Sequence, residues 1–145
     1  MATMEEVHGL PRLRTATDCP TCDPRSTMCR RILAIDDDPE TTGGLKRLLG
    51  AHGYEVREEN DSTKALASAK EFQPHYVILD YWMPHAHGGD VAWQIASERS
   101  LGATKLVMCS GFDPETFRRA LPPLRIPIFE KPVDTDALLE LIRAY

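Results

Sequence analysis

Short apolar runs alternate along the chain with longer segments in which apolar residues recur every three or four positions. The runs cover residues 32–35, 54–58, 76–79, 105–109 and 126–129, which are lengths typical of strands, and the second run alternates as an edge strand does. The longer segments have the spacing of amphipathic helices. Five strands alternating with five helices predict an α/β fold, a doubly wound parallel sheet with right-handed crossovers.

Capping residues and apolar spacing indicate where the helices begin and which side they bury. We expect Asp38 to cap the first helix ahead of Pro39, and Ser62 to cap the second. The third helix is expected at about residues 89–99, and Trp93 is interpreted as a packing residue of that helix, without a functional role. The buried stripe of the first helix is expected to consist of Leu45, Leu48 and Leu49, and Gly53 to end that helix. The fourth helix is expected to start at Asp113-Pro114-Glu115. Asp134 or Thr135 is expected to cap the last helix.

The first 29 residues show neither helical nor strand periodicity. We therefore expect residues 1–29 to form a flexible, cysteine-containing extension ahead of one domain at residues 30–145. The chain has 145 residues, 42% of them hydrophobic and 27% charged, which suits one compact domain with a core and makes a second folded domain improbable.

Charge and hydropathy argue against two classes of partner, nucleic acids and membranes. The formal net charge is −5 and no stretch gathers Lys and Arg on one face, so direct nucleic-acid binding is not expected. No apolar run approaches the roughly 20 residues of a membrane-spanning helix, and the acidic residues 1–6 are followed by no hydrophobic region. We expect a cytoplasmic protein without membrane contact.

Three of the four cysteines lie in the extension. Cys19 and Cys22 have the two-residue gap of a zinc or redox pair, with Cys29 and His8 as conceivable further ligands, although a structural zinc site usually has a second regular pair. The flanking residues favour a plain extension over a metal site. Cys109 lies in an apolar run and is expected to be a buried free thiol.

Polar side chains follow four of the five predicted strands. Asp36 and Asp37 follow the first, Asp80 the third, Ser110 the fourth and Lys131 the fifth. Ligands of open parallel sheets bind beyond the carboxyl ends of the strands, so these groups share one rim. Carboxylates packed closely repel one another, and a divalent cation, with Mg²⁺ the natural candidate, would explain the cluster.

This set of groups suits phosphoryl transfer to a carboxylate. A magnesium ion leaves coordination positions for a phosphate oxygen, while a lysine and a hydroxyl can bind the other oxygens. Asp80 would then be the nucleophile that forms an acyl phosphate.

Four short strings of the chain resemble the signatures of response-regulator receiver domains of the CheY-like kind. They occur in order, at fitting intervals, within residues 30–145: Ile32-Leu33-Ala34-Ile35-Asp36-Asp37-Asp38-Pro39, Ile78-Leu79-Asp80-Tyr81-Trp82-Met83-Pro84, Met108-Cys109-Ser110-Gly111 and Phe129-Glu130-Lys131-Pro132. The resemblance implies a flavodoxin-like sheet with strand order 2-1-3-4-5.

The resemblance also implies roles for the rim residues. Asp80 would be the phosphoacceptor and a metal ligand, Asp37 a direct Mg²⁺ ligand and Asp36 a ligand acting mainly through water. Trp82 would contribute its backbone carbonyl to the metal.

Two further groups would bind the phosphoryl group. By the same resemblance, Ser110 would be the switch hydroxyl and Lys131 the phosphate-binding lysine, ahead of a cis bond to Pro132. Two positions depart from the family pattern. Ile128 occupies the usual place of an aromatic switch residue, and His87 replaces a common acid.

The implied function is that of a stand-alone receiver in two-component signalling, since no output domain follows Tyr145. It would accept a phosphoryl group from a sensor histidine kinase or a histidine phosphotransfer protein and then bind a downstream protein target. Self-association through the fourth helix, fifth strand and fifth helix is one further expectation. Such a chain is a phosphoacceptor and not an enzyme in its own right.

Plainer interpretations stay open. The run 36–38 could be a helix-capping acidic run, Lys131 a surface lysine and Ser110 a turn residue, while His85 and His87 could bind a metal but are more often inert.

Three other functions compete with phosphotransfer. The first is a receiver-like module that binds proteins without being phosphorylated. The second is a phosphatase of the haloacid-dehalogenase type, which requires an acid where this chain has Trp82. The third is zinc-dependent or redox-dependent docking through the cysteines of the extension.

Overall fold

In the described part of the chain, a parallel sheet of five strands lies at the centre, in the order β2-β1-β3-β4-β5. The computed structural model describes residues 30–111 and 126–144. The strands are β1 (Arg31–Ile35), β2 (Glu55–Glu59), β3 (Tyr76–Asp80), β4 (Lys105–Ser110) and β5 (Ile128–Glu130). The predicted α/β class and strand order are confirmed, and β2 is an edge strand as expected.

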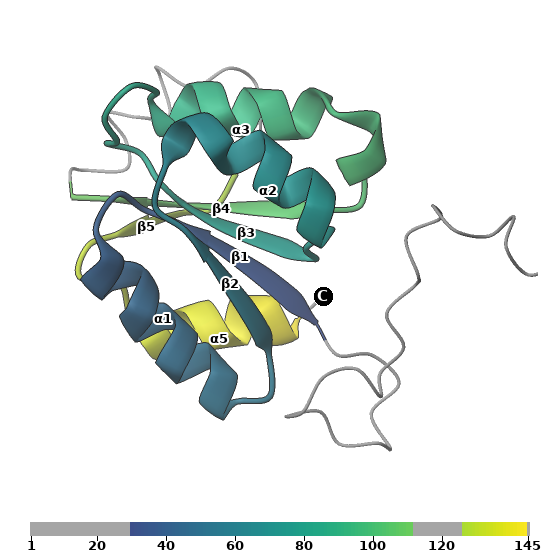
Figure 1. Ribbon diagram of the computed structural model, residues 1–145. Helices are drawn as coiled ribbons and strands as arrows, with labels where there is room; N and C mark the ends of the chain where they lie inside the picture. Colours follow the sequence, from purple (N-terminus) through teal and green to yellow (C-terminus); the bar gives the residue numbers. More distant parts are fainter. Residues whose placement is uncertain (1–29, 112–125, 145) are drawn as a thin grey trace, which may run out of the picture.

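Helices cover both faces of the sheet. Helices α2 (Ala65–Phe72) and α3 (Gly88–Ser97) lie on one face, and α1 (Pro39–Ala51) and α5 (Thr135–Arg143) on the other (Figure 1). Two short 3₁₀ turns, η3 (Ser62–Lys64) and η4 (Arg99–Leu101), precede α2 and follow α3. The helix predicted from Asp113, the extension at 1–29 and Tyr145 lie outside the described residues.

The strands alternate their side chains between two hydrophobic cores. On the α2–α3 face, Leu33, Val77 and Leu79 pack with residues such as Phe72 and Ile95. On the α1–α5 face the corresponding members are Ile32, Ile78, Val107, Leu49 and Ile142. Successive side chains of a strand point to opposite faces of the sheet. Asp36 and Asp80 lie an even number of residues after Ile32 and Ile78, so this alternation assigns both acids to the α1–α5 face.

Two of the three expected N-terminal helix caps within the described residues are confirmed. Asp38 accepts a hydrogen bond from the backbone N–H of Glu40, and Pro39 is the first residue of α1. Asp134 accepts from the N–H groups of Asp136 and Ala137 at the start of α5. The expected Ser62 cap is wrong: the preceding Asp61 caps η3, because its carboxylate accepts from the N–H of Thr63.

The prediction that Trp93 is a packing residue of α3 is also wrong. Its side chain is 51% exposed, since Val91, Ala92 and Ile95 form the buried stripe of α3 and Trp93 lies outside it. In α1, Leu49 is fully buried whereas Leu45 and Leu48 are partly exposed. Cys109 is a buried free thiol, and burial raises its pKa to about 12, so it stays neutral. No helix of the described ranges, 30–111 and 126–144, is long and apolar enough to cross a membrane.

Candidate functional site

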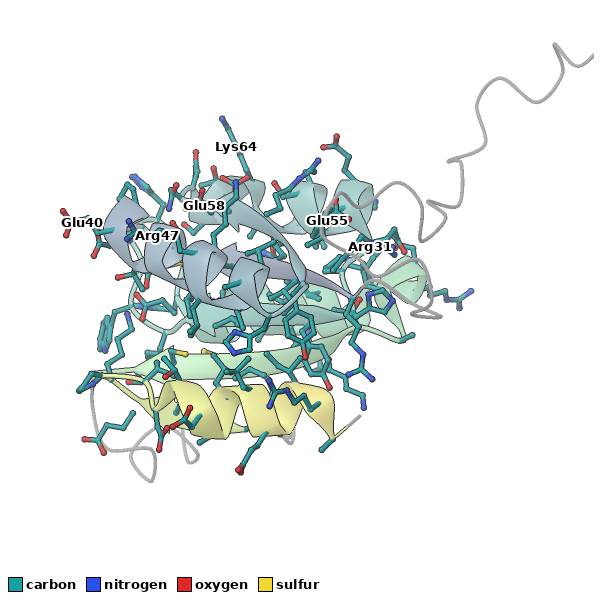
Figure 2. The ribbon with its side chains drawn as sticks, turned by 90° about the horizontal axis from the view of Figure 1, so that it is seen from below. Arg31, Glu40, Arg47, Glu55, Glu58 and Lys64 are labelled. Atoms are coloured by element: carbon teal, nitrogen blue, oxygen red, sulfur yellow. The ribbon has the colours of Figure 1, made fainter. Side chains whose placement is uncertain are left out.

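The candidate site lies at the carboxyl ends of the parallel strands. Asp36 directly follows β1, Asp80 ends β3, Ser110 ends β4 and Lys131 directly follows β5. In Figure 2 the labelled Glu40, in the first turn of α1, lies toward this end of the sheet and Arg31, where β1 begins, toward the other. The parallel topology therefore places residues from distant parts of the sequence on one rim.

Lys131 joins two of the carboxylates. Its Nζ lies 3.0 Å from Oδ2 of Asp36 and 3.1 Å from Oδ1 of Asp80. Both acids are nearly buried, at 4% and 7% exposed, whereas the lysine side chain is 31% exposed. The other oxygen of Asp36 accepts from the N–H of Asp38 at 3.0 Å, which fixes the orientation of that carboxylate.

The third acid completes a compact group. One oxygen from each of Asp36, Asp37 and Asp80 lies within 4.8 Å of the others. Asp37 is the exposed member, so the group opens toward solvent on that side. Three carboxylates against one ammonium leave an excess of negative charge at the rim.

The ionisation of these groups reflects that excess. Burial raises the pKa of Asp80, the charges of Asp36 and Asp37 raise it further, and Lys131 only partly opposes them. Desolvation, together with a hydrogen bond to Asp36 and the charge of Asp36, raises the pKa of Asp37. Burial opposes the charge on Lys131, but its hydrogen bonds to Asp36 and Asp80, together with the charges of these two acids, raise the pKa of the ammonium. Lys131 therefore stays charged, and its single positive charge does not balance the negative charge of the three carboxylates.

Such a donor set fits a small divalent cation. Hard cations prefer carboxylate and carbonyl oxygens, and a 2+ charge beside Asp37 would relieve the repulsion that raises these pKa values. The acidic cluster is therefore consistent with a bound Mg²⁺ ion.

Ser110 and Trp82 flank the acids differently. Ser110 is fully buried, and its carbonyl accepts from the backbone N–H of Lys131 at 2.7 Å, so β4 and β5 hold these two residues side by side. Trp82 lies two residues after Asp80 with its side chain 49% exposed, and its ring contacts those of Tyr81 and His87.

A groove between α1 and α5 continues from the carboxylates along the sheet. It encloses about 460 Å³ and is lined by apolar residues such as Leu45, Leu48 and Val133, with Asp80 and Lys131 at its polar end. The sequence motifs did not indicate this groove. The alternation of side chains along β1 and β3 could have indicated that it lies on the same face of the sheet as Asp36 and Asp80.

Comparison with known proteins identifies the family. The family model described as the response regulator receiver domain matches residues 32–143. The chain therefore belongs to the response regulator receiver family of two-component signalling.

Curated relatives match to different extents. Protein PilH of Pseudomonas aeruginosa is 28% identical over 115 residues, which cover 79% of this chain and 95% of PilH. The DNA-binding response regulator MtrA of Mycolicibacterium smegmatis is 37% identical over 65 residues, or 45% of this chain and 28% of MtrA. The response regulator MprA of Mycobacterium leprae is matched over 29% of its length. The chain thus spans less than a third of MtrA and MprA.

Solved structures support the same fold. The response regulator TrrA of Thermotoga maritima, in complex with Mg²⁺-BeF, has a TM-score of 0.70 and 27% identity over 79% of this chain and 97% of TrrA. The chemotaxis protein CheY4 of Vibrio cholerae has a TM-score of 0.71 and 23% identity over 81% of this chain and 98% of CheY4.

Proposed function

We propose that this receiver accepts a phosphoryl group from phosphohistidine onto Asp80, with Mg²⁺, and signals through a changed protein-binding surface. The observation that carries the proposal is the placement of Lys131 between Asp36 and Asp80, 3.0 and 3.1 Å from their oxygens, beside the third acid Asp37. A helix-capping role would use one acid, and Asp38 already fills it.

The metal ligands in this proposal are the three acids and one backbone oxygen. Asp37 and Asp80 bind the ion directly, Asp36 acts mainly through water, and Trp82 supplies its carbonyl. The Mg²⁺-BeF complex of TrrA supports a magnesium site in a related receiver. When bound, the ion would neutralise charge on the phosphoryl oxygens.

The residues of the chain then divide the transfer between them. A carboxylate oxygen of Asp80 attacks phosphorus, the bond from phosphorus to the histidine nitrogen breaks, and the phosphoryl group is held as an acyl phosphate. Lys131, already 3.1 Å from Asp80, binds one phosphoryl oxygen, and the Ser110 hydroxyl binds another as the switch residue. The chain assists its own phosphorylation and dephosphorylation and is otherwise no enzyme.

The partners follow from this chemistry. The donor is a sensor histidine kinase or a histidine phosphotransfer protein in the cytoplasm, and the phosphorylated receiver binds a downstream protein. The match along 95% of PilH supports a stand-alone receiver. The mass of the protein isolated from its own cells would distinguish this from a receiver within a longer chain. Self-association through β5, α5 and the predicted fourth helix stays a prediction.

The test is phosphorylation by a small acyl-phosphate donor with Mg²⁺, read by intact mass. Wild type is expected to gain one phosphoryl group, and Asp80→Asn or removal of the metal to abolish the gain. Asp136→Asn, an exposed acid in the first turn of α5, is the matched control and should behave as wild type.

Two outcomes would count against the proposal. A gain that persists in Asp80→Asn would place the acceptor elsewhere. No gain with either the small donor or a phosphorylated histidine protein would favour a binding module that is never phosphorylated.

A further inference from the structure

Residues 60–62, which run from the end of β2 into η3, contact both loops of the candidate site without contributing a group to it. The side-chain amide of Asn60 donates to the backbone carbonyl of Asp36 at 2.8 Å and to Oγ1 of Thr42 at 2.9 Å. Thr42 is fully buried in the first turn of α1. Asn60 therefore spans the turn that carries Asp36 and Asp37, from the end of β1 to the start of the helix.

Ser62 makes the equivalent contact to the second loop. Its hydroxyl donates to the carbonyl of Pro84 at 2.6 Å, and the residue is only 7% exposed. The loop between β3 and α3 is closed at its base by the N–H of Gly88, which donates to the carbonyl of Tyr81 at 2.7 Å. Ser62 thus fixes the middle of the loop that carries Trp82.

The residue between the two anchors fixes their relative position. Asp61 accepts from the N–H of Thr63 at 2.9 Å and from its hydroxyl at 2.6 Å, which sets the backbone of the segment. The N–H of Asp36 also donates to the carbonyl of Glu59 at 3.2 Å. Both anchors bind backbone carbonyls, so they determine where each loop lies and not how its side chains ionise.

We infer that Asn60 and Ser62 are positioning residues that hold the two loops at the separation required for Mg²⁺ to bind the acids and Trp82 together. The inference rests on the proposed magnesium-dependent function. A metal site with few protein ligands loses affinity when its ligands move by a fraction of an ångström. Losing either anchor therefore weakens binding of the ion but leaves the reacting groups in place.

The experiment measures Mg²⁺ binding by titration calorimetry on the full chain. Asn60→Ala and Ser62→Ala are each expected to weaken Mg²⁺ affinity by roughly threefold to tenfold. The loss is smaller than the roughly tenfold to hundredfold loss for partners of ligating side chains, because both anchors bond to the backbone carbonyls of Asp36 and Pro84 and not to a carboxylate. Thr104→Val is the matched control, because the Thr104 hydroxyl donates to the carbonyl of Pro74 at 2.7 Å beside the amino end of β4. It should leave Mg²⁺ affinity unchanged.

Phosphorylation rates separate positioning from general damage. The Mg²⁺ concentration at half-maximal rate should rise in both variants, while the rate at saturating Mg²⁺ stays within about twofold of wild type. Denaturation curves establish that each variant is folded under the assay conditions.

The outcomes distinguish the inference from the proposed function. If both anchor variants bind Mg²⁺ as tightly as Thr104→Val, or if all three lose affinity equally, the positioning role is wrong. If wild type binds no Mg²⁺, the proposed function itself is overturned.

Discussion

The backbone at His85 has a φ of 71°, in the left-handed region that favours glycine. Such a conformation costs a non-glycine residue roughly 1–2 kcal/mol, partly offset by the greater freedom of glycine in the unfolded chain. His85→Gly is therefore expected to raise the free energy of unfolding by about 0.5–1 kcal/mol in urea titrations. His87→Gly, two residues later at a φ of −72°, should lower it. Equal effects of the two changes would contradict the argument.

Gly88 lies where no side chain fits. A Cβ atom there would come within 2.4 Å of the carbonyl oxygen of Asp80 and 2.7 Å of Cα of Tyr81, both backbone atoms that cannot rotate away. We expect Gly88→Ala to lower the free energy of unfolding by about 1–3 kcal/mol. Gly44→Ala in α1, where nothing lies within 4 Å, should instead raise it by up to about 1 kcal/mol through helix propensity. Chemical denaturation of the pair measures the contrast.

His75 makes stability depend on pH. Its Nδ1 accepts from the N–H of Arg31 at 2.9 Å, and burial, with the charges of Arg31 and Arg30, lowers the pKa of its imidazole below 6.5. The unfolded chain therefore binds the proton first, so the stabilisation is complete above about pH 6.5 and declines as the pH falls below it.

Urea titrations at pH 7.5 and pH 5.0 test this dependence. His75→Gln should lose less stability than wild type between the two pH values. His52→Gln, a change at an exposed histidine, should lose as much as wild type. If the free energy of unfolding of wild type fell by the same amount as that of His75→Gln between the two pH values, His75 would not cause the pH dependence.

At the scale of the elements, two arginines at the start of β1 bind the ends of helices on opposite faces of the sheet. The Arg31 guanidinium donates to the carbonyls of Phe72 and Gln73 at the end of α2, at 2.8–3.1 Å. Arg30 donates to the carbonyl of Ile142 in the last turn of α5. A positive charge at these carbonyls also complements the helix dipole.

Removing one of these charges should loosen one helix end. Arg31→Met is expected to lower the free energy of unfolding by about 1–2 kcal/mol, measured by urea denaturation. Arg47→Met, on the exposed side of α1 and labelled with Arg31 in Figure 2, is the control, with a change within about 0.5 kcal/mol. A comparable loss in both variants would mean that the helix-end contacts contribute nothing specific.

The elements themselves were largely predictable from periodicity. Apolar runs marked all five strands, with bounds displaced by one or two residues, because hydrophobic patterns do not record where hydrogen bonding ends. Asp61 competes with Ser62 for the same cap, and the sequence could not rank them. The exposure of Trp93 follows from the stripe of Val91 and Ile95, four residues apart, which leaves it on the other side of α3.

At the scale of the whole molecule, the rim was predictable because parallel strands end on one edge. The sequence therefore indicated that Asp36, Asp37, Asp80 and Lys131 would meet, and the structure brings them together. It could not indicate the contacts of Asn60, which depend on loop geometry without a period. The groove between α1 and α5 likewise arises from how two helices lie on the sheet.

The boundary between the extension and the domain is the last testable feature. Among the described residues, every buried hydrophobic side chain lies between Ile32 and Ile142, and the first side-chain contacts to other elements come from Arg30 and Arg31. We propose that residues 30–145 are the folding unit.

Deleting residues 1–29 should change the free energy of unfolding by less than about 0.5 kcal/mol and leave phosphorylation intact. Deleting two more residues removes both arginine side-chain contacts and also the backbone hydrogen bonds that join Arg30 to Glu55 and Arg31 to His75, so the loss should exceed the sum of the Arg30→Met and Arg31→Met losses. A large loss from the shorter deletion would show that the extension is part of the folded domain.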